Sequence, residues 1–511
     1  MRKNGLQGTD RPWASHLRDG RRHGGSGEGG GRIDPRLDGR GSDAHAGPGQ
    51  VRGHDYGPYR NGGEEGDEQA LAGIADLALY GEEPARRSRH GFRHEVSDAP
   101  ERRLTPERTA PSLPGEAPDV FGRRRNVDFN FSEKQNALRE KVRGYTEANI
   151  SRAVVREIEE RDEFPHDLVK KFCELGLARI NIPEAYGGLN GDIVDLMIVF
   201  EEIAKRSPVL CWNLGNILLY GNEIIGVNGN QAQKDEYLPK LARGEIMFSF
   251  AITEPNAGSD AASIKTRALE AVPKDGSYVI NGGKIFITGA GVTQYTVTFA
   301  RTAESKYGGI TSFIVDTSLA GYSAKPIKKL GFHGSNTCEV VYDNVRVPPQ
   351  SILGGEEKGL NNGWKQEMKL LNQERLVLSS MTLGMAQSSF DEALQFAREK
   401  MQRTDPGTDV QSIQHDIAEM ASELEAMKVL AYSAAWKEAQ GLNPVRETSM
   451  TKYFCAETAK QIILKGMNVL GESASSMDYE MQRNLREILI FSIGGGTSQI
   501  QKNIICKTYG L

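Results

Sequence analysis

The sequence lacks any apolar run long enough to cross a lipid bilayer, which takes about 20 residues. The longest candidates, such as residues 196–200, are interrupted by charges. Cysteine is scarce as well: the five cysteines are odd in number and form no CxxC pair. This pattern is typical of buried thiols in a reducing compartment and predicts a cytoplasmic protein. The three histidines after residue 126 show no metal-ligand spacing, so no metal is expected.

A large excess of charge of one sign is also missing. The 511 residues contain 63 Lys+Arg and 68 Asp+Glu, which gives a net charge of −5. Proteins that bind nucleic acid through bulk electrostatics usually carry a basic stripe or face. We therefore expect no nucleic-acid partner and no membrane insertion.

Residues 1–126 differ in composition from the rest of the chain. They hold 23 of the 57 glycines and 20 arginines but one lysine, and they are poor in apolar residues, so we expect a disordered extension. An RGG-like nucleic-acid tail is disfavoured by the interspersed acidic residues. A twin-arginine export signal is disfavoured because no apolar segment follows the arginines. A third interpretation is translation upstream of the true start, with Val127 as an alternative initiator.

The following third of the chain shows helical periodicity. Ser132 stands three residues before Gln135, which predicts a capping box at the start of a helix over 132–150. Further helical patterns cover 164–183, 192–206 and 231–245. Residues 127–246 are thus expected to form an N-terminal α-helical domain.

Short runs rich in Val, Ile, Thr, Tyr and Phe follow, and they predict six to eight strands between Met247 and about Val347. The NGG turn at 281–283 predicts a hairpin between strands over 278–281 and 284–288. We expect these strands to form a compact antiparallel β-barrel over residues 247–358.

Three long helical patterns over 360–402, 412–440 and 446–471 end the chain. Helices of this length need partners to bury their apolar stripes, which predicts a C-terminal four-helix bundle over residues 359–511. The predicted fold class is α+β: a helical domain, a central β-barrel and a helical bundle.

Five motifs occur in order along this framework. FAITEPNAGSDAASIKTRA begins at Phe250, and IPEAYGGLNG, QKDEYLPKLARGE, INGGKIFITGA and ERLVLSSMTLGMAQ lie before or after it. The first resembles the T-E-P-x-A-G-S-D signature of the acyl-CoA dehydrogenase family, and together the motifs cover nearly all of residues 127–511. The helical, β-barrel and bundle architecture of that family agrees with the predicted elements.

The resemblance implies an FAD site. The family residue that matches Thr253 faces the flavin ring, and the one that matches Ser259 contacts the flavin phosphate or the thioester arm of the substrate. The residues that match Phe286 and Thr288 lie against the isoalloxazine, as suits a flat apolar ring that needs an aromatic wall and a few donors at its edge. The same resemblance assigns Phe250, Ile252, Gly258 and Thr497 to the cofactor site.

The reaction of the family needs a carboxylate that takes the α-proton of an acyl thioester. Most members carry this Glu in a late I-Y-E-G-T motif, which here is Ile493-Gly494-Gly495-Gly496-Thr497 and has no Glu. Isovaleryl-type and long-chain-type members supply the base from another helix, immediately before Arg-Leu. Glu374 of QERL stands at that place, and Leu370, Leu371, Val377 and Leu378 put it on an apolar helix face.

Two further roles follow from this alignment. The backbone N–H of Gly495 is expected to polarise the thioester carbonyl, because glycine removes the second carboxylate and keeps the donor. Arg375 is expected to contact the CoA or carrier phosphate region, with a helix-surface arginine as the alternative. The alternative for Glu374 is a structural ion pair with a neighbouring Arg or Lys.

The part of the resemblance that concerns the adenosine half of FAD is altered. In the family, R-x-Q-F-G of one subunit and Q-x-x-G-G of another hold this half. The aligned residues here are Lys400, Gln402, Arg403 and Thr404, and then Asn468, Gly471 and Glu472. These altered residues leave open how the adenosine half of FAD is bound. A sister subunit could supply the missing half of the site, or Arg403 could pair with Glu472.

The expected activity is FAD-dependent α,β-dehydrogenation of an acyl-CoA or acyl-carrier-protein thioester. Electrons would pass to an electron-transfer flavoprotein, and the assembly would be a homotetramer or a heterotetramer with a sister subunit. Two alternatives are a flavin monooxygenase or nitroalkane-type oxidase on the same fold, and a scaffolding subunit of a hetero-oligomeric dehydrogenase. Retention of Glu374 favours the dehydrogenase.

Overall fold

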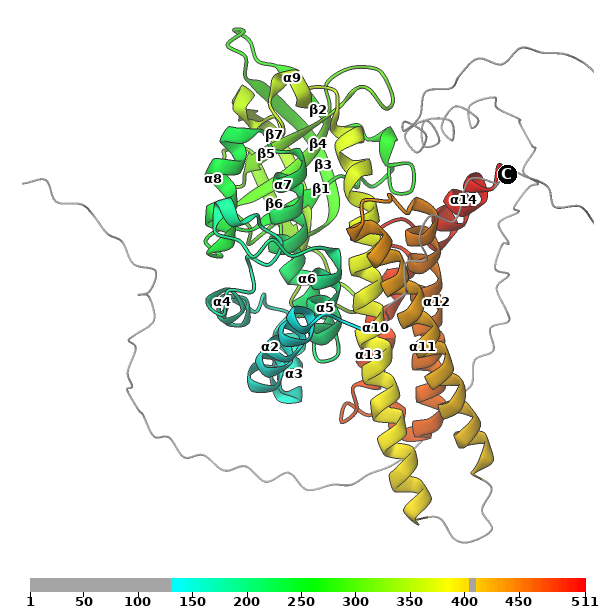
Figure 1. Cartoon of the computed structure of the whole chain (residues 1–511). Helices are drawn as coiled ribbons and strands as arrows, with labels where there is room; N and C mark the ends of the chain where they lie inside the picture. The colour runs from blue at the N-terminus through cyan, green and yellow to red at the C-terminus, as the bar shows by residue number, and fades with distance from the viewer. Residues whose placement is uncertain (1–129, 404–409) are drawn as a thin grey trace, which may run out of the picture. The chain divides into compact units, whose positions relative to one another are not determined.

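A computed structural model describes residues 130–403 and 410–511, and all of them belong to one compact unit. The Gly/Arg-rich extension predicted for residues 1–126, and Thr404, lie outside the described residues. Figure 1 shows the order of the parts: N-terminal helices, a central sheet, and a bundle of long helices. This order confirms the predicted fold class.

The N-terminal part is helical, as predicted. Ser132 caps the first helix, α2, and the reciprocal bonds of a capping box join Ser132 and Gln135. The elements of this part, in chain order, are α2 Glu133–Asn149, α3 Arg152–Arg161, α4 His166–Glu174, η1 Glu184–Tyr186, α5 Ile193–Ala204, α6 Pro208–Ile217, the π-helix η2 Leu218–Glu223, α7 Ile224–Asn228 and α8 Gln231–Ala242.

The strands of the described residues form one seven-stranded sheet in the order β1-β4-β2-β3-β7-β6, with β5 paired to β4. Most pairs are antiparallel, as predicted, but β1 and β2 each pair with β4 in parallel. The strands are β1 Phe248–Ala251, β2 Arg267–Glu270, β3 Tyr278–Thr288, β4 Tyr295–Arg301, β5 Ile310–Asp316, β6 Tyr322–Pro326 and β7 Thr337–Val347, with the short helix η3 Ala261–Ser263 between β1 and β2.

The predicted hairpin at the NGG sequence is wrong. Residues 278–288 form one continuous strand, β3, which pairs with β7 and shifts register between Ile280 and Gly282. Gly282 has φ +147°, and a Cβ there would lie 2.6 Å from Thr266 Oγ1. In this strand the glycines therefore do not form a turn. They allow a β-bulge and a close approach of the neighbouring backbone.

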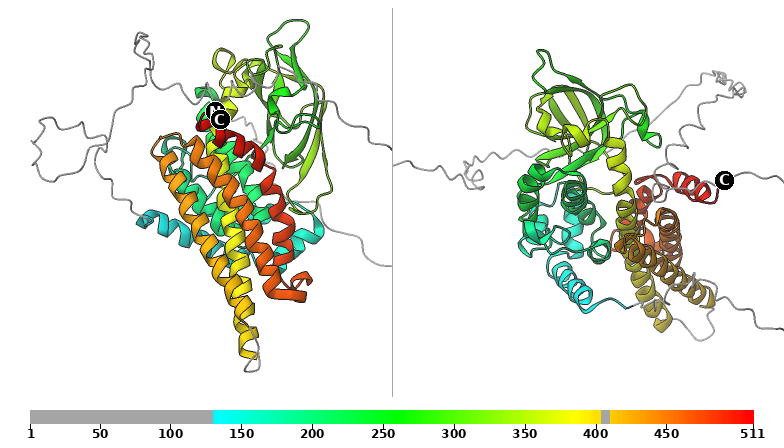
Figure 2. Two further views of the ribbon diagram at one scale, coloured as in Figure 1. Left: turned by 90° about the vertical axis from the view of Figure 1, so that its right-hand side faces the viewer. Right: turned by 45° about the horizontal axis from the view of Figure 1, so that its top comes forward.

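The C-terminal part is dominated by three long helices, of which α10 is central. It packs against α5, α11 and α12 and also touches β5, and both views of Figure 2 show it running from the sheet along the bundle. The elements of this part are η4 Pro349–Ser351, α9 Glu356–Gly359, α10 Gly363–Arg403, α11 Gln411–Ala439, α12 Val445–Leu470, η5 Gly471–Ser475, α13 Met481–Ile488, η6 Leu489–Ser492 and α14 Ser498–Thr508.

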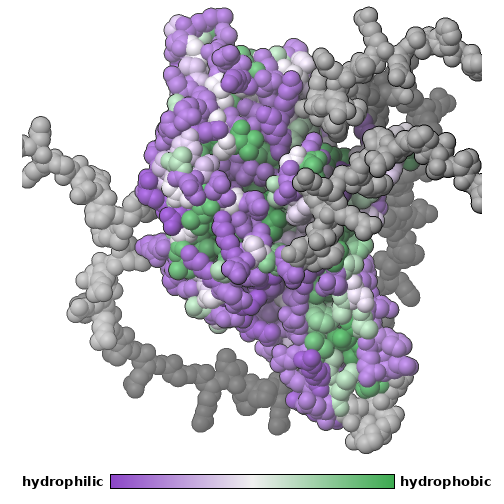
Figure 3. Space-filling model, in the orientation of Figure 1, coloured by the Kyte–Doolittle hydropathy of each residue, from purple (hydrophilic) through white to green (hydrophobic). Residues whose placement is uncertain are grey.

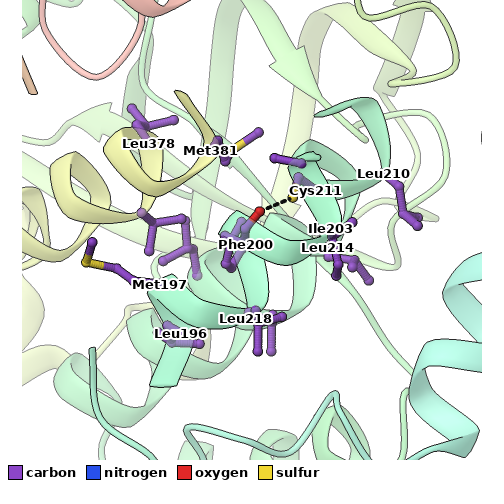
Figure 4. Packing of buried hydrophobic residues seen from close by; sticks show 14 of the residues in the cluster. Leu196, Met197, Phe200, Ile203, Leu210, Cys211, Leu214, Leu218, Leu378 and Met381 are labelled. Carbon is purple, nitrogen blue, oxygen red and sulfur yellow. Dashed lines mark hydrogen bonds between the residues drawn. The ribbon is translucent and has the colours of Figure 1, made fainter. Parts of the chain in front are cut away.

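The main core joins the N-terminal helices to α10. Figure 4 shows Leu378 and Met381 of α10 close to Met197 and Phe200 of α5, and Cys211 of α6 donates to the Phe200 carbonyl at 3.0 Å. These side chains are almost completely buried. Because protein cores pack as tightly as organic crystals, this contact fixes the α10 turn that carries Glu374.

Candidate active site

Glu374 lies on α10 at the meeting point of the helical parts and the sheet. Its side chain remains partly accessible although it is surrounded by protein. Burial raises the pKa of Glu374, while the charges of Arg375 and Lys452 and a hydrogen bond from Tyr220 oppose that rise. Within residues 130–403 and 410–511, the Glu374 carboxylate forms no direct ion pair. The expected alternative, a structural ion pair, is therefore not what the structure shows.

Tyr220 comes from the π-helix η2, and its hydroxyl donates a hydrogen bond to the Glu374 carboxylate. Its ring stacks on Phe250 of β1, with ring centroids 5.2 Å apart and an interplanar angle of 19°. Single π-helical turns are rare and occur often at functional sites, because the extra residue shifts the side chains that follow. Here that turn points Tyr220 at the carboxylate.

A small hollow adjoins Glu374. Its volume is about 20 Å³, which is room for one water molecule. Residues of η2, α7, β1 and α10 form its wall, and these are Leu219, Tyr220, Glu223, Ile224, Phe250, Glu367, Leu370, Gln373 and Glu374. The hollow therefore lies where a group held against Glu374 would extend.

The glycine loop predicted to face Glu374 lies next to it. Gly495 has φ +66°, and a Cβ at this residue would be 2.4 Å from Leu378 Cδ1, one turn after Glu374 on α10. Among the described residues no backbone acceptor takes the Gly495 N–H. The Gly495 loop thus packs on α10 one helical turn after Glu374, although the two residues are separated by about 120 residues of chain.

Lys452 of α12 holds the Gly495–Gly496 loop in place. Its ammonium group donates to the Gly496 carbonyl oxygen at 2.6 Å, and Gln501 donates to the same oxygen at 3.1 Å. Burial lowers the pKa of Lys452 to about 8, although Glu374 opposes this shift. Next along the chain, Thr497 caps α14 by accepting from the Ile500 N–H.

The T-E-P-x-A-G-S-D loop is fixed by a buried ion pair. The Glu254 carboxylate lies 2.8 Å from the Lys284 ammonium, and it also accepts from the backbone N–H groups of Lys265 and Thr266 at 2.6 and 2.9 Å. Lys284 donates in addition to the Ile252 carbonyl at 3.0 Å. This clamp leaves Thr253 and Ile252 partly exposed, and Gly258 and Ser259 exposed, at the end of β1.

The exposed face of Phe286 lies beside the Thr253–Ser259 loop. Phe286 is 63% exposed and has φ +63°, which is unfavourable for a bulky residue. The Ile285 N–H donates to the Thr253 carbonyl at 3.0 Å, so Phe286 and Thr253 are neighbours. Thr288 accepts a 2.7 Å hydrogen bond from the Trp212 indole. An exposed aromatic face next to polar edges suits a flat heteroaromatic ring.

Other predicted site residues lie elsewhere. Lys400 and Gln402 are exposed at the far end of α10, roughly 40 Å along the helix from Glu374. Asn468 and Gly471 are exposed at the end of α12. Within the described chain, Arg403 pairs with Glu399 at 3.9 Å. The suggested pairing of Arg403 with Glu472, whose family counterparts lie on different subunits, stays a prediction.

Arg375 is only 5% exposed, which excludes the helix-surface alternative. Burial lowers its pKa to about 10, and Glu374 and Glu367 oppose this shift. Sequence reasoning missed Tyr220, Lys452, Glu223 and Glu367. The one available signal was the presence of polar residues within otherwise apolar helical segments.

Comparison with known proteins places this geometry in a family. Three family models match consecutive parts of the chain: acyl-CoA dehydrogenase N-terminal domain at residues 132–245, middle domain at 249–345 and C-terminal domain at 361–510. The chain belongs to the acyl-CoA dehydrogenase family. It is therefore an oxidoreductase that acts on CH–CH bonds, and its cofactor is FAD.

Similar proteins include an acyl-CoA dehydrogenase of Bacillus subtilis, 36% identical over 386 residues, which are 74% of this chain and 98% of the relative. The caffeyl-CoA reductase-Etf complex subunit CarC of Acetobacterium woodii is 34% identical over 377 residues, or 73% and 98% of the two chains. The solved butyryl-CoA dehydrogenase of Megasphaera elsdenii has 28% identity and a TM-score of 0.71, and the match covers 75% of this chain and all of that one.

The residues of this member of the acyl-CoA dehydrogenase family fit the flavin. The exposed Phe286 face, the partly exposed Phe250, Ile252 and Thr253, and the Thr288 hydroxyl would hold the ring, and the exposed Gly258–Ser259 loop has room for a phosphate. In the described residues, no helix is both long and apolar enough to cross a membrane.

Proposed function

We propose that this chain removes two hydrogens from the α and β carbons of an acyl thioester, with Glu374 as the base. The observation that supports the proposal is a Glu374 carboxylate without an ion pair among the described residues, one helical turn before Leu378, the residue against which Gly495 packs. Phe286, Thr253 and Thr288 would hold FAD, which would supply the acceptor for the β-hydride. Glu374 takes the α-proton, and burial raises its pKa in the direction that favours this role.

Gly495 acts on the carbonyl group of the same thioester. Its N–H donates to the thioester carbonyl oxygen, which stabilises the negative charge that develops there as the α-proton leaves. Lys452 keeps the loop in place through Gly496. Both acyl-CoA and acyl-carrier-protein thioesters present this carbonyl, so the CoA-linked and carrier-linked substrates are both compatible with the site.

Electrons leave to an electron-transfer flavoprotein in this proposal, supported by the similarity to the Etf-complex subunit CarC. The protein is proposed to act in the cytoplasm. Lys400, Gln402, Asn468 and Gly471 lie too far from Glu374 to serve the same flavin within one chain. We propose that they serve the adenosine half of FAD in a neighbouring subunit of a homotetramer or a heterotetramer.

The bundle surface supports such an assembly. Figure 3 shows a hydrophobic strip over the lower parts of α10 and α11. Val429 and Trp436 of α11 are each 46% exposed, and small residues such as Ala426 line a shallow hollow beside Val429. Exposed apolar patches of this kind often mark interfaces.

The test is the visible spectrum of the purified full chain during anaerobic addition of acyl-CoA thioesters. Wild type is expected to contain flavin that bleaches. Glu374→Gln is expected to retain the flavin band but lose reduction, while Asp391→Asn on the exposed face of the same helix behaves as wild type. Normal reduction by Glu374→Gln would refute the assignment of the base. Oxygen consumption without any thioester would instead support the oxidase alternative.

A further inference from the structure

Trp212 of α6 touches two parts of the candidate site, and the proposed reaction gives it no role. Its indole N–H donates to Thr288 Oγ1 at the end of β3 at 2.7 Å. The opposite edge of the indole reaches the loop after η6, where its Cη2 atom would lie 3.8 Å from a Cβ on Gly494. One side chain therefore spans the wall assigned to the flavin and the loop that contains Gly495.

The indole is packed between other aromatic rings. The ring centroid of Phe332 lies 5.0 Å from that of Trp212, and the centroid of Phe491 lies 5.7 Å away with its ring nearly perpendicular. Phe332 and Phe491 are both buried. A side chain packed on several sides keeps one rotamer, so the N–H is aimed at Thr288 before any ligand binds.

The hydrogen bond from Trp212 restricts what the Thr288 hydroxyl can do. A threonine hydroxyl has one hydrogen to donate and two acceptor lone pairs, whereas an indole N–H can only donate. Because Thr288 Oγ1 accepts from Trp212, the Thr288 hydrogen remains available for another partner.

The protein itself offers that hydrogen a poor acceptor. Among the described residues, the one hydroxyl that could take it is Thr337 Oγ1, which is 3.5 Å from Thr288 Oγ1. A normal O–H···O hydrogen bond spans about 2.7–2.8 Å, and Thr337 already shares a 2.9 Å hydrogen bond with Ser335. The hydrogen of Thr288 is thus free to be given to a ligand at the wall.

We propose that Trp212 is a positioning residue that makes the Thr288 hydroxyl a hydrogen-bond donor to the polar edge of the flavin ring. Trp212 does this by occupying an acceptor lone pair of Thr288, so that the hydroxyl hydrogen points to the acceptor atoms of the ring. Hydrogen bonds at that edge tune the electronic properties of a flavin. The proposal concerns the cofactor, and it holds whether or not Glu374 is the base.

A role in packing alone would have a different consequence. In that case the bond between Trp212 and Thr288 only satisfies two polar groups of the protein. Loss of the indole N–H would then act on FAD binding through the aromatic packing, independently of the Thr288 hydroxyl. A positioning role acts only through that hydroxyl, so coupling between the two residues separates the alternatives.

The experiment is a double-mutant cycle on FAD binding. The full chain is stripped of flavin, and calorimetric titration with FAD gives the dissociation constants of wild type, Trp212→Phe, Thr288→Val and the double variant. Thr288→Val is expected to weaken binding about fivefold, and Trp212→Phe about threefold. In the Thr288→Val background, Trp212→Phe should change the dissociation constant by less than about twofold, because the group through which it acts is gone.

Two further variants separate the hydroxyl and the N–H from the size of the side chains. Thr288→Ser keeps the hydroxyl, so Trp212→Phe should still weaken binding about threefold in that background. Placing 3-benzothienylalanine at residue 212 keeps the shape of the indole and removes its N–H, so it should reproduce Trp212→Phe. This replacement also keeps the test available if Trp212→Phe does not fold.

The visible spectrum of the bound flavin gives an independent measurement. Trp212→Phe and Thr288→Val should shift the flavin band in the same direction, and the double variant should show no shift beyond that of Thr288→Val. The control is Trp364→Phe, because Trp364 is also buried but its indole N–H has no acceptor among the described residues. Trp364→Phe should keep the wild-type affinity and spectrum.

Three outcomes would overturn the proposal. One is an equal loss of FAD affinity on Trp212→Phe in the wild-type and Thr288→Val backgrounds, which would make Trp212 a packing residue. Another is wild-type affinity with 3-benzothienylalanine at residue 212, which would show that the N–H has no effect. The third is a wild-type chain that binds no FAD. Failure of flavin reduction by thioesters would refute the proposed reaction and leave this cycle unaffected.

Discussion

The Lys452 ammonium group donates a 2.6 Å hydrogen bond to the Gly496 carbonyl and, through its charge, opposes the rise that burial causes in the pKa of Glu374. One side chain of α12 therefore acts on both halves of the proposed catalytic pair. It fixes the loop that presents the Gly495 N–H, and it favours the ionised form of the base on α10.

Replacing this lysine should change the pH dependence of flavin reduction. In Lys452→Met the pKa of Glu374 rises, so the acid limb of the rate profile, which requires ionised Glu374, moves to higher pH. Wild type should in turn lose rate as pH rises through about 8, where Lys452 loses its proton, and the variant should lack this second limb. The measurement is single-turnover bleaching between pH 5 and 10.

The control for this change is Lys465→Met. Lys465 binds Glu419 and Glu423 on the bundle surface, so its loss should leave the profile unchanged. An acid limb at the same pH in Lys452→Met and wild type would contradict the role of Lys452.

Gly495→Ala should lower the reduction rate about tenfold or more. The new methyl group would meet Leu378 Cδ1 at 2.4 Å, and the backbone at φ +66° is unfavourable for alanine. Gly441→Ala is a matched control, since Gly441 has φ +72° with no atom near the added methyl group. Gly441→Ala should lose some stability and no activity. Restoration of part of the rate by Leu378→Ala in the Gly495→Ala background would confirm the steric cause, and equal rates in the two glycine variants would exclude it.

Loss of the Glu254–Lys284 pair should destabilise the protein and release flavin. In Lys284→Met the Glu254 carboxylate stays buried without its cation, which typically costs about 3–5 kcal/mol of the free energy of unfolding. Denaturant titration measures this loss, and the flavin content after gel filtration reports the state of the Thr253–Ser259 loop. Lys274→Met, which removes an exposed pair with Glu270, should leave both unchanged. A similar result for Lys284→Met would show that the clamp is dispensable.

Much of the fold was predictable because it depends on local patterns. The Ser132–Gln135 capping box and the amphipathic periods of the long helices are short-range features, and they appear where the sequence predicted them. The NGG segment shows the limit of such reasoning. A hairpin and a bulged strand use the same glycines, and only pairing with β7, about 60 residues later, selects the bulge.

The sequence by itself determined the family motifs, the proposed base Glu374 and its apolar helix face, because these are features of single segments. Only the tertiary structure decided what surrounds that carboxylate. Tyr220 and Glu223 reach it through a π-helical turn, Lys452 through the packing of α12 on α10, and Gly495 through contact with Leu378. These contacts join residues 78 to 154 positions apart, and their geometry follows from core packing, which no local pattern encodes.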